Sequence, residues 1–394
     1  MRARPWLPLL LGFLTAVGPA STDMYLPAFP AIEAGLHAPP GAAQYTLAAW
    51  FAGLAVGQLT QGTISDRFGR RAPLIAASAI YTIACAACAL APSILALSAF
   101  RVVAAIAASA GMVIPRAMVR DLADGHEAAR MLSRLMLVMG VAPILAPSVG
   151  GAVLIFATWR WIFWIMAGYG AVSLGLVIRF LPDTMAPDHR MRLPPGRVLA
   201  RYIAILRERH FLTNAAMGAA GTFAFFAYLA GSSPVFIDGF GFSPSAYGVL
   251  FGICAIGLIG SAQLNARLLP RFGTATILRF VSRAYALAAA VLVAVAFARV
   301  HVFVAVFAPL FVMVSLQGVI NPNTTAGALG RHGAQAGSAS AVMGTMQFLM
   351  GAISGLLVGV FTDTTPRGMA GLMALGAVGL LLADRARARA SLAA

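Results

Sequence analysis

Apolar residues along this chain form long runs that recur from one end to the other, with short polar segments between them. Each run is long enough, at 1.5 Å per residue, to cross a hydrocarbon layer about 30 Å thick as an α-helix. The twelve runs cover residues 6–29, 43–65, 73–91, 93–116, 132–157, 160–181, 210–236, 244–264, 275–297, 301–323, 335–361 and 367–383. This pattern predicts an all-α membrane protein with twelve transmembrane helices.

One long polar stretch, residues 182–209, separates the sixth run from the seventh. It is rich in Arg and contains Pro187, Pro194 and Pro195. We therefore predict two six-helix halves, residues 1–181 and 210–394, joined by a cytoplasmic linker over residues 182–209.

The two halves share a faint internal repeat. A shift of 204 positions aligns Gly53 with Gly257, Leu54 with Leu258, and Arg67-Phe68-Gly69 with Arg271-Phe272-Gly273. Asp66 falls on Pro270, so the acid of the first copy is missing from the second. The matches lie at equivalent places in each half, which favours a duplication and two pseudo-symmetric six-helix bundles.

Composition excludes a soluble protein, because 60% of the residues are hydrophobic and only 10% are charged, against about a quarter in soluble domains. The net charge of +16 comes from 28 basic residues, all of them Arg. These Arg stand in short clusters between apolar runs and do not form the broad basic face that nucleic acid requires. We expect the lipid bilayer as a partner and no nucleic acid.

The Arg clusters also predict the orientation of the chain. With the N-terminus in the cytoplasm, all but four of the 28 Arg fall on the cytoplasmic side, as the positive-inside rule requires. Arg160, Arg299 and Arg367 then face outward, and Arg101 lies within the membrane. The run that follows Arg2 and Arg4 continues to about Pro30, which favours a retained first helix over a cleaved signal peptide.

Cys85 and Cys88 have the C-x-x-C spacing of redox and zinc sites. No His, Asp or Glu stands near them in the sequence to complete a ligand set. We interpret them as small apolar residues that pack a helix, and we predict no metal site.

A polar motif covers the end of the run 43–65 and the residues after it: Gly62-Thr-Ile-Ser-Asp66-Arg67-Phe-Gly69-Arg70-Arg71. Gly62 would let helices approach closely, Gly69 would permit a tight turn, and Asp66 could pair with Arg and cap the next helix. The motif closely resembles the G-x-x-x-D-R-x-G-R-R signature of the major facilitator superfamily. The resemblance implies the major facilitator fold and a cytoplasmic gate at Gly62, Asp66, Arg67, Gly69 and Arg70; a plain topogenic Arg cluster is the alternative.

The run 132–157 contains Gly140-Val-Ala-Pro143-Ile-Leu-Ala-Pro147-Ser-Val-Gly150-Gly151. Two prolines in a membrane helix free backbone carbonyls and create a kink, and paired glycines allow close packing. The segment resembles the superfamily's antiporter motif. Together with the signature after residue 61, it favours exchange against an ion over uniport.

The run 6–29 contains Ser21-Thr-Asp23-Met-Tyr25-Leu-Pro27-Ala-Phe-Pro30. This resembles the S-x-D-x-Y-L-P-x-x-P signature of the Bcr/CflA drug-resistance subfamily. The resemblance implies a monomeric, multi-pass protein of the bacterial inner membrane that exports drugs such as amphenicols or bicyclomycin against protons, with no other cofactor. Some multidrug relatives have a second acid where this chain has neutral Thr15, which leaves export of cationic drugs open.

Asp23 and Arg101 are ionisable residues inside apolar runs, where charges are costly and mark function. Counted from the outer face, their depths agree within about one helical turn. We predict that they meet across a cavity, with Asp23 as the proton carrier and Arg101 as its electrostatic partner. The alternative places Asp23 at a watery edge and makes Arg101 a static structural partner.

Flat, soft or polar side chains in the runs are candidates for a drug-binding surface. They are Tyr25, Met112, Phe223, Phe226, Tyr228 and Asn321, together with Asp23 and Arg101. A metabolite transporter of the same fold is the alternative function. An enzyme would need a nucleophile–base or metal cluster at one face of the membrane, and the sequence contains no such pattern.

The orientation can be tested with reporter fusions. A reporter placed after His189 should behave as cytoplasmic and one near Gly241 as periplasmic, because of the asymmetric distribution of Arg. Alkaline phosphatase and green fluorescent protein fusions measure the two locations, and the opposite pair of results would overturn the map.

Overall fold

The computed structural model describes residues 6–123, 125–185, 190, 194–332, 335–361 and 363–392. Pro187, Asp188 and His189 of the expected linker lie outside the described residues. The elements in chain order are α1 (Leu7–Thr15), α2 (Val17–Asp23), η1 (Leu26–Ala28), α3 (Phe29–Gly35), α4 (Ala42–Phe68), α5 (Arg71–Ala89), α6 (Ile94–Leu122), α7 (Gly125–Phe156), α8 (Arg160–Phe180), α9 (Pro195–Arg207), α10 (Arg209–Ser233), η3 (Pro234–Gly239), α11 (Pro244–Phe297), α12 (Phe303–Leu329), α13 (Ala336–Phe361) and α14 (Arg367–Leu392).

These elements make the twelve crossings that the sequence predicts. The first crossing consists of α1, α2, η1 and α3 in succession, and α10 continues into η3. Helix α11 makes two crossings, because the backbone turns at Gly273, whose φ of 68° and ψ of 158° are not helical. The predicted all-α, twelve-helix fold is therefore confirmed.

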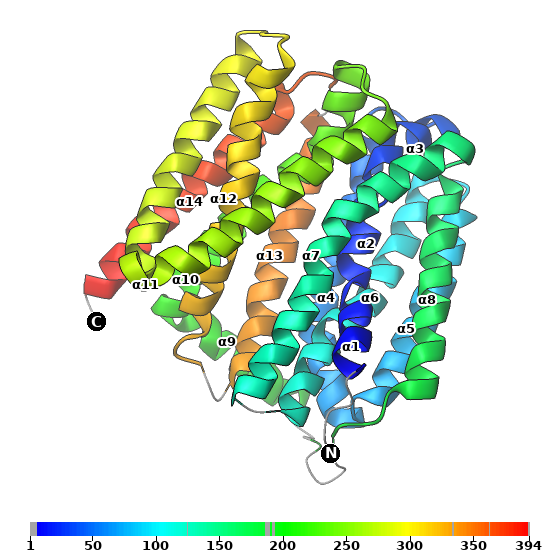
Figure 1. Ribbon diagram of the computed structural model, residues 1–394, viewed down its shortest axis with the longest axis vertical. Helices are drawn as coiled ribbons and strands as arrows, with labels where there is room; N and C mark the ends of the chain where they lie inside the picture. Colours follow the sequence, from blue (N-terminus) through cyan, green and yellow to red (C-terminus); the bar gives the residue numbers. More distant parts are fainter. Residues whose placement is uncertain are drawn as a thin grey trace.

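The crossings form two groups that lie side by side. Figure 1 shows α1 to α8 on the right and α10 to α14 on the left, with both chain ends and α9 toward the lower end. We call this lower end, with the connections after α4, α6 and α8, the linker end. The opposite end, with the connections after α3, α5, α7, η3, α13 and the second crossing of α11, is the far end.

At the far end the two groups are held together by glycines. Gly150 of α7 packs within its own half, where it leaves no room for a Cβ beside the carbonyl oxygen of Met24. The adjacent Gly151 contacts the other half, because a Cβ there would lie 2.6 Å from the carbonyl oxygen of Pro244. Gly41 approaches the backbone of Gly359 in the same way. Small residues let helix backbones come this close, so helices of opposite groups are in direct backbone contact at this end.

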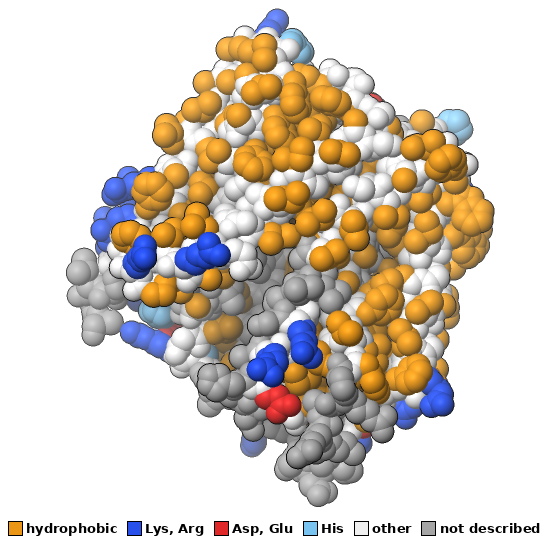
Figure 2. All heavy atoms as spheres, viewed as in Figure 1, with side chains coloured by type: hydrophobic (Ala, Val, Ile, Leu, Met, Phe, Trp, Pro, Cys, Tyr) orange, Lys and Arg blue, Asp and Glu red, His pale blue; other side chains and the backbone are white. Residues whose placement is uncertain are grey.

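Toward the linker end, Figure 1 shows α7 and the first crossing of α11 moving apart. Contacts between the groups here involve α4: the Thr345 hydroxyl donates to the Ala55 carbonyl (3.1 Å), and the Tyr202 hydroxyl of α9 donates to the Leu59 carbonyl (3.1 Å). Figure 2 shows a surface that is mostly apolar, with basic side chains gathered mainly toward the lower part.

The internal repeat is visible in the backbone. Gly69 and Gly273 both adopt positive φ, 87° and 68°, directly before the next crossing begins. Gly53 packs against Val102 of α6, and Gly257 packs against Phe311 and Ser315 of α12. The repeated glycines therefore perform the same structural task in each half.

The close contact at Gly150 predicts a strong effect of one methyl group. Gly150→Ala should lower the free energy of unfolding by about 1–3 kcal/mol, the usual cost of overpacking, although Ala is the better helix former. Gly175→Ala in α8, where a Cβ meets nothing within 4 Å, should be neutral or stabilising. Thermal unfolding of the purified variants measures both, and equal melting temperatures would contradict the packing argument.

Candidate functional site

The first crossing is broken near its middle, and this break positions Asp23. Helix α2 ends at Asp23, and Pro27 and Pro30 occupy the first turns of η1 and α3. Proline has no backbone N–H, so Pro27 cannot donate to the carbonyl of Asp23 four residues earlier. The break therefore places a carboxylate where the helix is interrupted.

The Asp23 side chain is buried, with 6% exposed. It lies within electrostatic range of the hydroxyl groups of Tyr228 and Tyr247, both from the other half. The Tyr247 hydroxyl also forms a hydrogen bond of 2.8 Å with Ser232. Asp23 is thus an interior residue in this structure, within electrostatic range of the other half, and its role in proton transfer stays a prediction.

Arg101 of α6 is fully buried among aromatic rings. Its guanidinium carbon lies 3.9 Å from the ring centre of Tyr25 and 4.5 Å from that of Trp50. Its Nη1 donates to the carbonyl of Ser21 at 3.0 Å, and the Trp50 indole N–H donates to the Thr22 hydroxyl at 3.0 Å. Cation–π attraction strengthens when water is excluded, so Arg101 binds the broken crossing to α4 and α6.

The expected pairing of Asp23 with Arg101 is not present in this structure. The ion pairs among the described residues include neither side chain. Arg101 is directed to the Ser21 carbonyl and the rings, whereas Asp23 lies within electrostatic range of tyrosines of the other half. Within the described part of the chain, Nε and Nη2 of Arg101 have no hydrogen-bond partner, so this guanidinium retains two donors.

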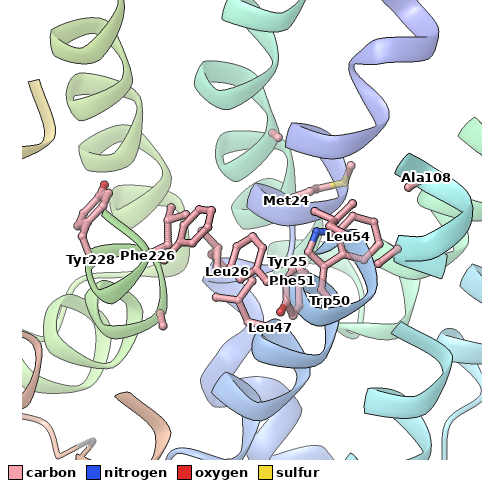
Figure 3. Close-up of a cluster of buried hydrophobic side chains, with 14 of the residues drawn as sticks. Met24, Tyr25, Leu26, Leu47, Trp50, Phe51, Leu54, Ala108, Phe226 and Tyr228 are labelled. Atoms are coloured by element: carbon pink, nitrogen blue, oxygen red, sulfur yellow. The ribbon is translucent and has the colours of Figure 1, made fainter. Parts of the chain in front are cut away.

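Aromatic side chains from both halves stack at the centre. The rings of Phe51 in α4 and Phe226 in α10 lie 3.9 Å apart with an interplanar angle of 16°, and Phe348 of α13 is nearly parallel, 6.4 Å from Phe226. Figure 3 shows Phe226 close to Phe51, with Tyr228 on the other side. Tyr228 stacks on Phe251 of α11 at 5.7 Å. Phe226 therefore stacks on Phe51 of the N-terminal half, whereas Tyr228 stacks on Phe251 within the C-terminal half.

The remaining predicted drug-binding residues are not all together. Met112 packs its sulfur against Gly18 of the first crossing. Phe223 is buried, and its carbonyl accepts a hydrogen bond from Ser354 (2.8 Å). Asn321 is exposed, and its Oδ1 accepts from Gln347 Nε2 at 3.1 Å. Asn321 is thus apart from the packed centre, and Gln347 is a polar neighbour that the sequence did not reveal.

Arg70 organises the motif at the linker end. Its Nε donates to Asp121 at 2.8 Å, and its Nη1 donates to Asp66 at 2.6 Å and to Ser65 at 2.8 Å. Burial lowers the pKa of Arg70, but the hydrogen bonds to Asp121 and Asp66 raise it above its ordinary value overall. Its main-chain N–H donates to Asp183 at 2.9 Å, so one residue joins the ends of α4, α6 and α8.

Two details of this motif differ from expectation. Asp66 binds Arg70 but does not cap α5; the carboxylate of Asp183 accepts the Arg70 N–H there. A Cβ on Gly62 would meet only Val113, at 3.9 Å. The close approach of α4 and α6 occurs instead at Gly53 and Gly57, which lie earlier in α4. The sequence alone does not distinguish Gly62 from Gly53 and Gly57, because only the structure shows where α4 and α6 cross.

The other motif residues divide between surface and interface. Arg67 is exposed beside the Phe68 ring, and Gly69 needs its positive φ of 87° for the turn into α5. In α7, Gly140, Pro143 and Pro147 continue the helix without ending it. A Cβ on Gly248 would lie 2.9 Å from the Pro147 carbonyl, so the segment from Pro147 to Gly151 contacts α11 directly.

In the described part of the chain, no three His, Cys, Asp or Glu side chains gather as metal ligands would.

Residues 11–355 match the model of the Major Facilitator Superfamily. The chain belongs to this superfamily of transporters. The family predicted from the glycine- and arginine-rich motif is therefore confirmed, and the protein is a multi-pass membrane protein.

Curated relatives extend over nearly the whole chain. An uncharacterized MFS-type transporter of Bacillus subtilis is 35% identical over 379 residues, covering 94% of this chain and 92% of the relative. A bicyclomycin resistance protein homolog of Haemophilus influenzae is 28% identical, covering 89% and 88%. A chloramphenicol resistance protein of Pseudomonas aeruginosa is 28% identical, covering 69% and 64%. The names of the latter two match the drug-resistance subfamily that the Asp23 motif resembles.

Solved superfamily structures show the same fold. A D-xylose–proton symporter aligns with a TM-score of 0.74 at 17% identity, covering 96% of this chain and 95% of the symporter. A bacterial homolog of the human lysosomal transporter Spinster aligns with a TM-score of 0.72 at 16% identity, covering 99% and 98%. At this identity the likeness concerns the fold alone.

The Arg70 network predicts unequal effects of its two acids. Asp121→Asn should lower thermal stability and transport more than Asp66→Asn, because Asp121 accepts two bonds from Arg70 and its side chain is 20% exposed, against one bond and 43% for Asp66. Charge-assisted hydrogen bonds contribute about 1.5–3 kcal/mol. Melting temperature and transport per molecule measure the order, and the reverse order would contradict it.

Proposed function

We propose that this protein is a proton-coupled antiporter that exports drug-like small molecules, of the amphenicol, bicyclomycin or multidrug type, by alternating access. The observation that carries the proposal is Asp23, a carboxylate buried at a helix break between the two halves. Relatives named for bicyclomycin and chloramphenicol resistance support the drug class.

Asp23 is the proton carrier in this proposal. A buried carboxylate holds a proton more readily than one in water and releases it when water reaches it. Tyr228 and Tyr247 belong to the other half, so a change of charge on Asp23 changes the attraction between the halves. Proton uptake and a change of the open side are thereby linked.

Arg101 is the electrostatic partner of Asp23 in another state of the cycle. Its Nε and Nη2 are the two donors without a partner in the described part of the chain, and a carboxylate is the acceptor that suits a guanidinium fork. A shift of the broken crossing would bring the charged form of Asp23 to these donors. A drug between them competes with that pairing.

The drug surface in this proposal is the aromatic stack at the centre, together with polar groups of α12 and α13. Phe226, Phe51 and Phe348 offer flat apolar faces, and Asn321 with Gln347 offers polar groups. Tyr25, Met112, Phe223 and Tyr228 are the further drug-binding residues of this proposal. Because Phe226 and Phe51 are stacked on each other, a bound drug would separate them as the halves move.

The Arg-rich linker end lies in the cytoplasm of a bacterial cell in this proposal, and the chain acts as a monomer in the inner membrane. The tight glycine contacts then close the periplasmic end. A metabolite transporter of the same fold is the alternative; it would take up its substrate, whereas an exporter lowers drug accumulation.

The proton role predicts the behaviour of Asp23→Asn. This variant resembles the protonated form and cannot release a proton, so it should bind drug but lose proton-driven efflux and drug-induced proton release. Glu127→Gln, which alters an exposed carboxylate at the linker end, should retain both. Efflux from energised vesicles and a pH indicator with purified protein measure the two activities.

Retention of both activities by Asp23→Asn would remove Asp23 as the carrier. Wild-type efflux that is unaffected by an uncoupler would overturn proton coupling itself. Drug-stimulated uptake in place of efflux would favour the metabolite transporter.

A further inference from the structure

A second cavity lies at the far end of the C-terminal half, away from Asp23. It encloses about 270 Å³ between the connection that follows α11 and the connection that precedes α14. Three of its lining residues are basic: Arg299, His301 and Arg367. Phe240, Val300 and Pro366 add apolar walls.

The basic residues are unusual for this end of the molecule. Under the orientation predicted from the Arg clusters, only Arg160, Arg299 and Arg367 lie on this side. Arg160 is accounted for locally, because its guanidinium stacks 4.3 Å from the Trp159 ring and donates to the Ala91 carbonyl at 3.2 Å. The other two converge on one cavity.

No ion pair of the described residues includes the two arginines of this cavity or its histidine, His301. The nearby carboxylate of Asp363 accepts hydrogen bonds from the N–H and hydroxyl of Thr365, at 2.9 and 2.7 Å. The guanidinium of Arg367 makes one long hydrogen bond, 3.5 Å, from Nε to the Ala296 carbonyl. The cavity therefore has a positive charge that an anion would complement.

Apolar side chains beside the cavity show what kind of anion fits. Phe297 is 61% exposed, Val302 is 55% exposed and Val304 is 63% exposed. They flank the basic loop at the ends of α11 and α12, where a membrane helix meets the polar headgroups. A phosphate with attached acyl chains would satisfy both the basic cavity and the apolar flank, whereas a soluble anion would satisfy only the first.

We propose that this cavity binds the phosphate headgroup of an anionic phospholipid, with the acyl chains along Phe297 and Val304. Arg299 and Arg367 donate to the phosphate oxygens, because a guanidinium fork matches phosphate geometry. A lipid with a net negative charge should bind more tightly than a neutral one, since each basic residue near an anionic lipid adds to the affinity. The lipid would thereby tie the α11–α12 connection to the start of α14.

The test compares two lipids with identical acyl chains, phosphatidylglycerol and phosphatidylcholine, on the full-length protein in a neutral detergent. Native mass spectrometry gives the affinity of each. Wild type should prefer phosphatidylglycerol, and Arg299→Gln and Arg367→Gln should each reduce the preference about fivefold. The double variant should lose it.

Arg160→Gln is the matched control, because it removes one far-end charge outside the cavity and should leave the lipid preference unchanged. An unchanged preference in both single variants, or an equal loss in Arg160→Gln, would overturn the site.

Glycerol phosphate tests the source of the anion. Displacement of phosphatidylglycerol by millimolar glycerol phosphate would show a site for soluble phosphate and overturn the lipid assignment. The readout is lipid binding, so it is independent of the proposed efflux.

Discussion

In a bilayer, every backbone carbonyl that a helix break releases must find a partner inside the protein, and the first crossing meets this requirement through Arg101. Its guanidinium binds the Ser21 carbonyl, and its face is covered by the Tyr25 and Trp50 rings. Without these contacts, the break that exposes Asp23 to the other half would leave polar groups in an apolar interior. The location of the candidate proton carrier thus depends on a neighbouring positive charge that does not pair with it.

The two halves are joined and braced by different kinds of interaction. Between them, glycines pack directly against backbone, as at Gly151 and Gly41. Within the N-terminal half, the charged network of Arg70 joins α4, α6 and α8. Glycine contacts separate without leaving buried charges unpaired, whereas the Arg70 network would be costly to break. This division favours motion of each half as a unit, with the interface as the part that opens.

Most of the fold could be predicted from the sequence, because length and apolarity determine which segments can cross a membrane. The fine geometry of the site could not. The sequence places Asp23 and Arg101 at similar depth, but only the structure shows that Arg101 is directed to the Ser21 carbonyl and that Asp23 lies within electrostatic range of Tyr228 and Tyr247. Depth along a helix follows from counting residues, whereas the direction of a side chain depends on how each helix is rotated against its neighbours.

The aromatic partners were missed for a related reason. Trp50 and Phe51 are two large residues within an apolar run, and such residues face lipid as often as they face an interior. The structure shows that Trp50 contacts Arg101 and Phe51 contacts Phe226. Adjacent positions on α4 therefore serve the two halves separately, which no periodicity of apolar residues could indicate.

The duplicated halves have diverged in chemistry while keeping their packing. Gly69 and Gly273 make equivalent turns, yet Asp66 corresponds to Pro270, and α12, the counterpart of α6, contains no charged residue at all. The charged groups of the centre therefore belong to the N-terminal half, and the C-terminal half contributes Phe226, Tyr228 and Tyr247. An ionisable residue inside a membrane is costly. One carboxylate near neutral hydroxyls therefore costs less free energy than one carboxylate in each half would. It also means that the charge state of one residue, Asp23, can bias the position of both halves.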